Sequence, residues 1–139
     1  MREIKFRVWS GIERKFRYQV GSIGVSRLFE TWSVSASLGD RTSINENLYS
    51  QVTIQQFTGL KDKNGKDIYE GDILSIPDND PYSTSGNSFN VVEYRHGGFG
   101  YIDTFTKKFD LISFLIGESD VDNCAVVIGN ILENPELLR

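Results

Sequence analysis

The chain has 139 residues, of which 39% are hydrophobic and 24% charged, and its formal net charge is −4 at pH 7. These values are typical of a folded chain and exclude an intrinsically disordered one, and no apolar run approaches the ~20 residues that a membrane-spanning helix needs. A single cysteine, Cys124, and a single histidine, His96, exclude an internal disulfide and a zinc site built from several Cys or His ligands.

The N-terminal residues predict a β-hairpin. Over residues 3–9 apolar side chains alternate with charged ones, which is the pattern of a half-buried strand, and residues 16–20 repeat the alternation after a turn. Aromatic and basic side chains interleave here and could stack nucleic-acid bases; they are Phe6, Trp9, Phe16 and Tyr18 with Arg7, Arg14 and Arg17. The acidic net charge of the chain argues against this role, because binding to phosphates needs an excess of Lys and Arg.

Residues 21–50 carry weaker signals. Val25–Trp32 predicts either a short helix or an irregular strand, and the sequence leaves both open. Ser33–Asn47 is rich in Ser, Asn, Asp and Gly and predicts a long loop. Loops of this length are usually functional or mobile.

The middle of the chain predicts a second hairpin. Gln51–Phe57 indicates a strand, and Asn64–Gly65 predicts a two-residue type I′ turn in which both residues have positive φ. The chain then returns as a strand over Asp67–Ile76, in which Gly71 marks a bulge that redirects the strand into the core. Pro77–Ser88 predicts a loop.

The last third of the chain adds strands and one helical turn. A turn at His96–Gly98 and apolar patterning predict three strands, which are Asn90–Arg95, Phe99–Asp103 and, within residues 123–132, the buried strand Ala125–Ile128. Lys107–Ile116 fits a buried strand or a short helix equally well, and Asn134–Glu136 is typical of a helix start. We therefore expect a mainly β fold, a small twisted or bent antiparallel sheet or barrel with a long loop and a short C-terminal helical turn.

Three carboxylates follow the turn of the second hairpin. Asp67, Glu70 and Asp72 could serve acid–base chemistry or bind a divalent metal, and Glu70 and Asp72 would share one face of a strand. Carboxylates in such positions are far more often structural, and neither a serine nucleophile motif nor a phosphate-binding loop accompanies them. The residues therefore predict no catalytic, cofactor or metal site.

Three segments are distinctive in their order and spacing, and they are Arg2–Trp9, Phe57–Leu74 and Val127–Leu138. Together they resemble the YopX family of phage and prophage proteins. Ser10 and Leu132 depart from the residues that are usual at their positions, and neither position has a known role. The resemblance implies a mainly β protein that a phage or prophage encodes, with no established catalytic activity.

Organisation and location follow from the same evidence. The start, Met1–Lys5, lacks the apolar core of a signal peptide. We therefore expect one domain over residues 1–139, located in the cytoplasm of a bacterial host.

Two hypotheses of function remain. The first is a non-catalytic binding or assembly protein that associates with itself and with a host or phage protein; its net charge of −4 disfavours nucleic acid, and no membrane or cofactor is expected. The alternative is a small metal-dependent hydrolase or nuclease that uses Asp67, Glu70 and Asp72.

The second hairpin carries the predicted interaction surface, at Lys61, Lys63, Lys66 and Glu70. Turn and bulge positions of the family segments are predicted to be structural, and these are Asn64, Gly65, Gly71, Asp72, Gly129 and Pro135.

Overall fold

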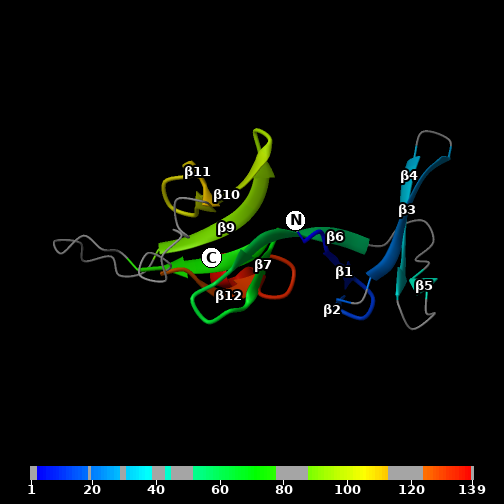
Figure 1. Cartoon of the computed structure of the whole chain (residues 1–139), viewed down its shortest axis with the longest axis horizontal. Helices are drawn as coiled ribbons and strands as arrows, with labels where there is room; N and C mark the ends of the chain where they lie inside the picture. The colour runs from blue at the N-terminus through cyan, green and yellow to red at the C-terminus, as the bar shows by residue number, and fades with distance from the viewer. Residues whose placement is uncertain are drawn as a thin grey trace. The chain divides into compact units, whose positions relative to one another are not determined.

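A computed structural model describes most of the chain, namely residues 3–18, 20–28, 31–38, 43–44, 52–77, 88–112 and 124–138. These residues contain twelve β-strands and the 3-10 helix η2 (Pro135–Leu138) (Figure 1). The chain divides into two compact units, Glu3–Gln56 and Phe57–Arg139. The structure confirms the predicted mainly β fold with a C-terminal helical turn. No helix among the described residues has the length and apolarity to cross a membrane.

The first unit begins with the predicted N-terminal hairpin. Strand β1 (Phe6–Ser10) pairs antiparallel with β2 (Lys15–Arg17), and this register places Trp9 opposite Phe16. On its other side β1 pairs antiparallel with the first half of β6 (Val52–Lys61). The hairpin prediction is therefore confirmed.

The remainder of the first unit is a three-stranded antiparallel sheet. Its order is β3 (Val20–Leu28), β4 (Thr31–Leu38) and β5 (Ser43–Ile44). The open choice at Val25–Trp32 is thus decided in favour of strand at Val25–Leu28 and Thr31–Trp32, and its other two residues lie outside the described ones. The loop predicted at Ser33–Asn47 is wrong over β4 and β5, and its other residues lie outside the described ones.

The sequence of β4 explains that error. Trp32, Val34, Ala36 and Leu38 alternate with serines and a threonine, which is the period of a strand. The abundance of serine suggested a loop, but pairing with β3 supplies the backbone hydrogen bonds that make the strand stable.

The second unit contains a five-stranded antiparallel sheet. In spatial order its strands are β11 (Phe109–Leu111), β10 (Gly98–Asp103), β9 (Ser88–Arg95), β8 (Asp72–Ile76) and β12 (Val126–Asn130). Figure 1 shows β9 strongly curved between its neighbours, as the predicted bent sheet requires. The last strand of the chain therefore returns to lie beside β8, at the opposite edge from β11.

The turn between β9 and β10 is a type I′ turn. His96 and Gly97 have φ values of 52° and 83°, and Arg95 pairs with Gly98 across the turn. Two central residues with positive φ define the type I′ hairpin. The prediction of a turn here and of strands on both sides is confirmed, although the sequence suggested type I′ geometry at Asn64–Gly65 instead.

The two remaining predictions for this unit are decided by pairing. Lys107–Ile116 contains the strand β11, while residues 113–116 lie outside the described ones. The strand predicted at Ala125–Ile128 is present as β12, with a register shift between Val127 and Gly129 and with Ile128 exposed.

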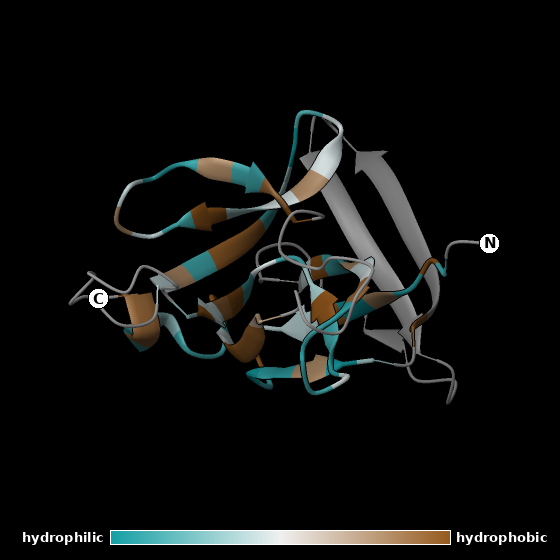
Figure 2. Cartoon of the chain, turned by 60° about the vertical axis from the view of Figure 1, so that its left-hand side comes forward, coloured by the Kyte–Doolittle hydropathy of each residue, from teal (hydrophilic) through white to brown (hydrophobic). Residues whose placement is uncertain are grey.

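The core of the second unit lies against one face of the five-stranded sheet. All five residues of β8 are buried, as expected for a central strand that is covered on both faces. Hydrophobic residues recur along these strands (Figure 2), and the core cluster consists of Ile68, Leu74, Ile76, Val92, Phe99, Ile112, Ala125 and Val127.

Candidate functional site: the family segments and the exposed turns

The second hairpin joins β6 to β7 (Asp67–Tyr69) through a turn that differs from the predicted one. The Gly65 amide donates to the Asp62 carbonyl at 2.9 Å, and the Asp62 amide donates to the Lys66 carbonyl at 2.8 Å. Gly65 has a φ of 80°, but Asn64 is not among the residues with positive φ. This is the pattern of a type I turn followed by a left-handed glycine, so the type I′ prediction is wrong at Asn64 and right for Gly65.

Asp62 connects this turn to the last strand. Its side chain is 4% exposed. One carboxylate oxygen accepts from the amides of Asn64 (2.8 Å) and Lys66 (2.9 Å), and the other accepts from the Val127 amide at 3.0 Å. The Lys63 amide also donates to the Ala125 carbonyl at 3.0 Å. The hairpin therefore covers the start of β12, whose outer edge would otherwise be open to pairing.

Gly71 lies at a corner rather than in a bulge. The strand predicted over Asp67–Ile76 is interrupted at Glu70–Gly71, where the chain leaves β7 and enters β8. Gly71 has a φ of 74°, which a residue with a Cβ rarely adopts. Its amide donates to the Val92 carbonyl at 2.8 Å, and its carbonyl accepts from the Ile131 amide at 2.9 Å. The predicted redirection of the chain is present, and a turn produces it.

Asp72 is a buried structural carboxylate. It is 1% exposed, and it accepts a hydrogen bond from the Tyr69 amide at 2.8 Å and one from the Asn130 side-chain amide at 3.1 Å. Asn130 in turn accepts from the Leu132 amide at 3.0 Å. These bonds close the corner at Gly71 against the end of β12.

The C-terminal segment explains two further predicted positions. A Cβ on Gly129 would lie 2.8 Å from Asn134 Oδ1 and 2.8 Å from Leu137 Cδ1, so a larger residue there would require both side chains to shift. Pro135 is the first residue of η2, as predicted. The Asn134 side chain accepts from the Asn130 amide at 3.3 Å, so it faces back to β12 instead of capping the amides that follow it.

Asp67, Glu70 and Asp72 do not form a metal-binding group. Asp67 accepts from Lys61 Nζ at 2.6 Å, while Asp72 is bonded to Tyr69 and Asn130. The corner at Glu70–Gly71 also removes the common strand face that the sequence suggested. Among the residues that the structure describes, no group of three or more His, Cys, Asp or Glu side chains could hold a metal ion.

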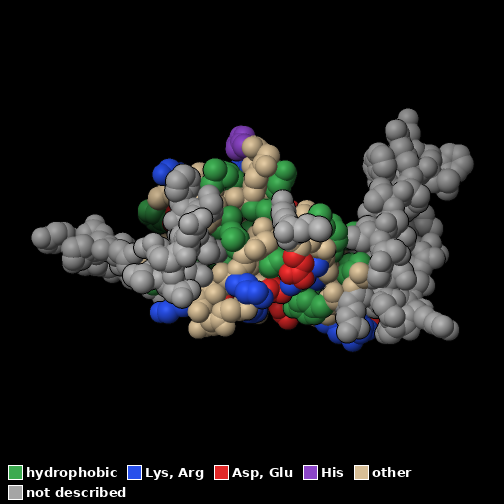
Figure 3. All heavy atoms as spheres, viewed as in Figure 1, with side chains coloured by type: hydrophobic (Ala, Val, Ile, Leu, Met, Phe, Trp, Pro, Cys, Tyr) green, Lys and Arg blue, Asp and Glu red, His purple; other side chains and the backbone are tan. Residues whose placement is uncertain are grey.

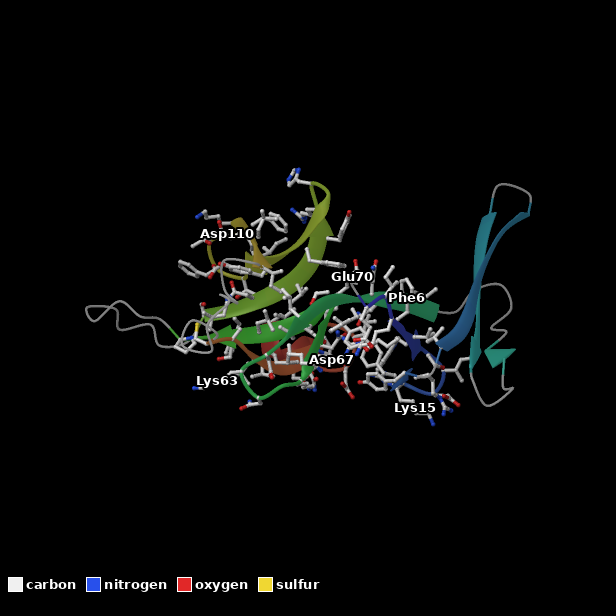
Figure 4. The ribbon with its side chains drawn as sticks, in the orientation of Figure 1. Phe6, Lys15, Lys63, Asp67, Glu70 and Asp110 are labelled. Atoms are coloured by element: carbon white, nitrogen blue, oxygen red, sulfur yellow. The ribbon has the colours of Figure 1, made fainter. Side chains whose placement is uncertain are left out.

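The four predicted surface residues differ in exposure. Lys63 and Lys66 are exposed, and Figure 4 shows the Lys63 side chain extending away from the ribbon at the turn. Lys61 is bound to Asp67, and Glu70 is half-buried. Neither Lys63 nor Lys66 forms an ion pair with any part of the chain that the structure describes.

The interleaved aromatic and basic residues of the N-terminal hairpin pack on one another. The Arg7 guanidinium lies 4.1 Å from the centroid of the Phe16 ring, and its Nε and Nη2 donate to Gln55 Oε1 at 3.0 and 2.7 Å. Arg7 is 3% exposed although charged side chains of a half-buried strand usually face solvent, and Trp9 is 7% exposed. Arg7, Trp9 and Phe16 therefore serve the fold of the first unit, whereas Tyr18 is 58% exposed and Arg14 is exposed.

The turn between β10 and β11 presents an aromatic side chain that sequence analysis missed. Phe105 is 93% exposed. Asp103 Oδ1 accepts from the amides of Phe105 and Thr106, and the Lys107 amide donates to the Asp103 carbonyl at 2.9 Å. The Thr106 amide is the largest of the causes that hold the pKa of Asp103 below its usual value of 3.8. Asp103 is a residue type that favours an Asx turn, but this signal does not show whether Phe105 is exposed.

Two glycines of the strand that leads to this turn lie close to residues of β11. A Cβ on Gly100 would overlap the Phe109 ring and the Asp110 carbonyl, and one on Gly98 would lie 3.3 Å from Leu111 Cδ2. The side chains of β11 therefore cover the backbone of β10, as aromatic residues do beside strand glycines. Figure 3 shows hydrophobic side chains reaching the surface around β9 and β10.

Comparisons with known proteins agree with this arrangement. The family described as YopX protein matches residues 5–139, and the chain belongs to this family. The crystal structure of protein EF1440 from Enterococcus faecalis is similar, with a TM-score of 0.65 and 28% sequence identity over 100% of both chains. The comparison with curated proteins gave no match. The predicted family is therefore confirmed.

Proposed function

We propose that this protein is a non-catalytic binding or assembly protein that a phage or prophage encodes and that acts in the cytoplasm of the bacterial host. Its partner is a host or phage protein. Two features disfavour nucleic acid, namely the net charge of −4 and the use of Arg7 inside the first unit. The alternative of a metal-dependent hydrolase is disfavoured because hydrogen bonds from Tyr69 and Asn130 occupy the Asp72 carboxylate.

The observation that carries this proposal is the ordered turn around Phe105. Covering a large aromatic side chain that is 93% exposed is favourable, so a partner that buries Phe105 would gain binding free energy. The hydrogen bonds to Asp103 hold the turn in one conformation, so little conformational entropy is lost when a partner binds. Rigid aromatic side chains that enter a pocket are the usual energetic centres of protein interfaces.

Photocrosslinking tests the proposal directly. A benzophenone-bearing amino acid replaces Phe105 in the bacterial cell that carries the gene, and irradiation should yield a covalent adduct with another protein molecule. Tyr94 is the matched control, because it is an aromatic residue of the same sheet and is 54% exposed. Identical adducts from both positions, no adduct from position 105, or an adduct with nucleic acid would contradict the proposal.

A thermal-shift measurement tests the enzymatic alternative. A metal that binds the folded state raises the melting temperature by mass action. We expect Mg²⁺, Mn²⁺ and Ca²⁺ to leave the melting temperature unchanged. A rise that Asp67→Asn abolishes would favour the hydrolase instead.

A further inference from the structure

The structure assigns Asn64 as a site of spontaneous deamidation, which the second hairpin suppresses while Asp62 holds it to β12. The reaction is a chemical modification of the chain itself, and it proceeds when the hairpin is released. The inference is independent of the Phe105 turn.

Asn64 and Gly65 are a pair of residues that can react with each other. Asn64 is the only asparagine of the chain that a glycine follows. Both residues are exposed, and a Cβ at Gly65 would meet nothing within 4 Å. The Asn64 side chain forms no hydrogen bond within the part of the chain that the structure describes. Water therefore has access to the pair, and the absence of a side chain on Gly65 leaves its nitrogen unhindered.

The reaction is an attack by the Gly65 backbone nitrogen on Cγ of Asn64. A bond forms between this nitrogen and Cγ, the bond between Cγ and Nδ2 breaks, and Nδ2 leaves as ammonia with the proton of the Gly65 amide. Water then opens the resulting five-membered succinimide at either carbonyl and gives aspartate or isoaspartate. Water is consumed, ammonia is released, and no oxidant or reductant is needed.

The folded turn keeps the reacting groups apart. Asn64 is the third residue of the type I turn, a position at which ψ is about 0°. At that angle the Gly65 nitrogen eclipses the backbone nitrogen of Asn64, whereas ring closure requires it to eclipse Cβ. The Gly65 amide also donates to the Asp62 carbonyl at 2.9 Å, which opposes loss of its proton. The turn must therefore open before the ring can form.

Asp62 controls how often the turn opens. Its carboxylate accepts from the amides of Asn64, Lys66 and Val127 at 2.8, 2.9 and 3.0 Å. Rotation about the Cα–C bond of Asn64 displaces the Gly65 and Lys66 amides, so their bonds to Asp62 must break first. The deamidation rate of the folded chain is therefore the rate of an unfolded chain multiplied by the fraction of molecules with a released hairpin.

Isoaspartate makes this release permanent. In that product the main chain runs through Cβ and Cγ of residue 64, so the turn contains one more backbone atom. The Gly65 and Lys66 amides then cannot both keep their bonds to Asp62. Either product also adds a negative charge between Lys63 and Lys66 in the sequence, within the predicted interaction surface.

Mass spectrometry of the chymotryptic peptide Lys61–Tyr69 measures the reaction in the full chain. Fragment ions locate the change at residue 64, and enzymatic carboxyl methylation quantifies isoaspartate. The chain unfolded in urea should yield both products, and the folded wild type should react roughly 100-fold more slowly. Gly65→Ala should slow the reaction of the unfolded chain, because its Cβ crowds the attacking nitrogen.

A pair of matched variants tests the control by Asp62. Asp62→Asn should raise the rate of the folded chain by roughly 100-fold, because the hairpin then opens more often. Asp67→Asn makes the same chemical change in an exposed pair with Lys61 and should leave the rate unchanged.

Hydrogen exchange of the wild type gives a test that does not depend on a folded variant. Exchange of the Gly65 amide needs the same opening as deamidation. Its protection factor should therefore agree with the ratio of the deamidation rates in the unfolded and folded chains.

Four results would overturn the inference. They are equal rates in the folded and unfolded wild type, equal rates in folded Asp62→Asn and Asp67→Asn, products of the unfolded chain that lack isoaspartate, and a Gly65 protection factor that differs from the ratio of rates. None of them affects the crosslinking expected at position 105, so the proposed function is tested separately.

Discussion

Replacing Asp62 by asparagine should destabilise the second unit far more than any other carboxylate-to-amide change in its hairpin. The carboxylate is 4% exposed and accepts from three backbone amides, two in the turn and one at Val127. Asparagine offers one oxygen instead of two. Whichever way its side-chain amide is turned, an N–H group then faces another N–H group, and at least one buried donor loses its acceptor.

The magnitude follows from those bonds. A hydrogen bond to a charged acceptor contributes about 1.5–3 kcal/mol, and leaving a buried donor unpaired costs a similar amount. Asp62→Asn loses one hydrogen bond and leaves one buried backbone N–H group facing the N–H group of the asparagine. We therefore expect a decrease of about 3 kcal/mol in the free energy of unfolding. For a chain of this size each kcal/mol lowers the melting temperature by roughly 3–4 °C, so Asp62→Asn should melt about 10 °C below the wild type.

The control lies in the same hairpin. Asp67→Asn makes the same chemical change, but Asp67 pairs with the exposed Lys61 side chain, and such pairs contribute only about 0–1 kcal/mol. Thermal denaturation by circular dichroism measures both variants, and hydrogen exchange should show the amides of Val127 and Lys66 losing protection in Asp62→Asn alone. Equal melting temperatures for the two variants would refute the argument that Asp62 holds the hairpin to β12.

Three more predictions concern backbone positions and pH. Gly65→Ala should lower the free energy of unfolding by about 1 kcal/mol through its φ of 80° alone, since a Cβ there meets nothing within 4 Å, while Lys63→Ala should not change it. Gly100→Ala should displace β11 and melt well below Gly98→Ala, because its Cβ would overlap the aromatic ring and a backbone carbonyl of that strand. The pKa of Asp103 is lowered, so its contribution is present above the usual value of 3.8 and is lost as the pH falls through the lower value in the folded protein. Amide exchange in the turn should rise over that acid range, and no such rise should occur in an Asp103→Asn variant, whose turn is pH-independent.

Much of the local structure could be predicted because it depends on neighbours in sequence. The strands β1, β9, β10 and β12 follow from alternation or short apolar runs bounded by turn residues. Gly65 and Gly71 were recognised as special backbone positions, and both have positive φ. Family membership was also evident from the sequence, because three segments retain their order and spacing.

The errors arose where pairing decides the outcome. The serine-rich β4 became a strand because β3 lies beside it, and the type I′ turn formed at His96–Gly97 because the ends of β9 and β10 are in register there. Phe105 was passed over because nothing in the sequence distinguishes an exposed aromatic side chain from a buried one. Exposure depends on which strands lie next to the turn.

The sequence by itself determined the mainly β class, the turn glycines and the family. Only the tertiary structure decided which residues of the central family segment bond to the C-terminal one. Asp62 bonds to Val127, and Asp72 bonds to Asn130, across separations of 65 and 58 residues. A buried carboxylate must find donors wherever the fold supplies them, since leaving it unpaired is very costly. For that reason the roles of these two aspartates could not be predicted before the position of β12 was known.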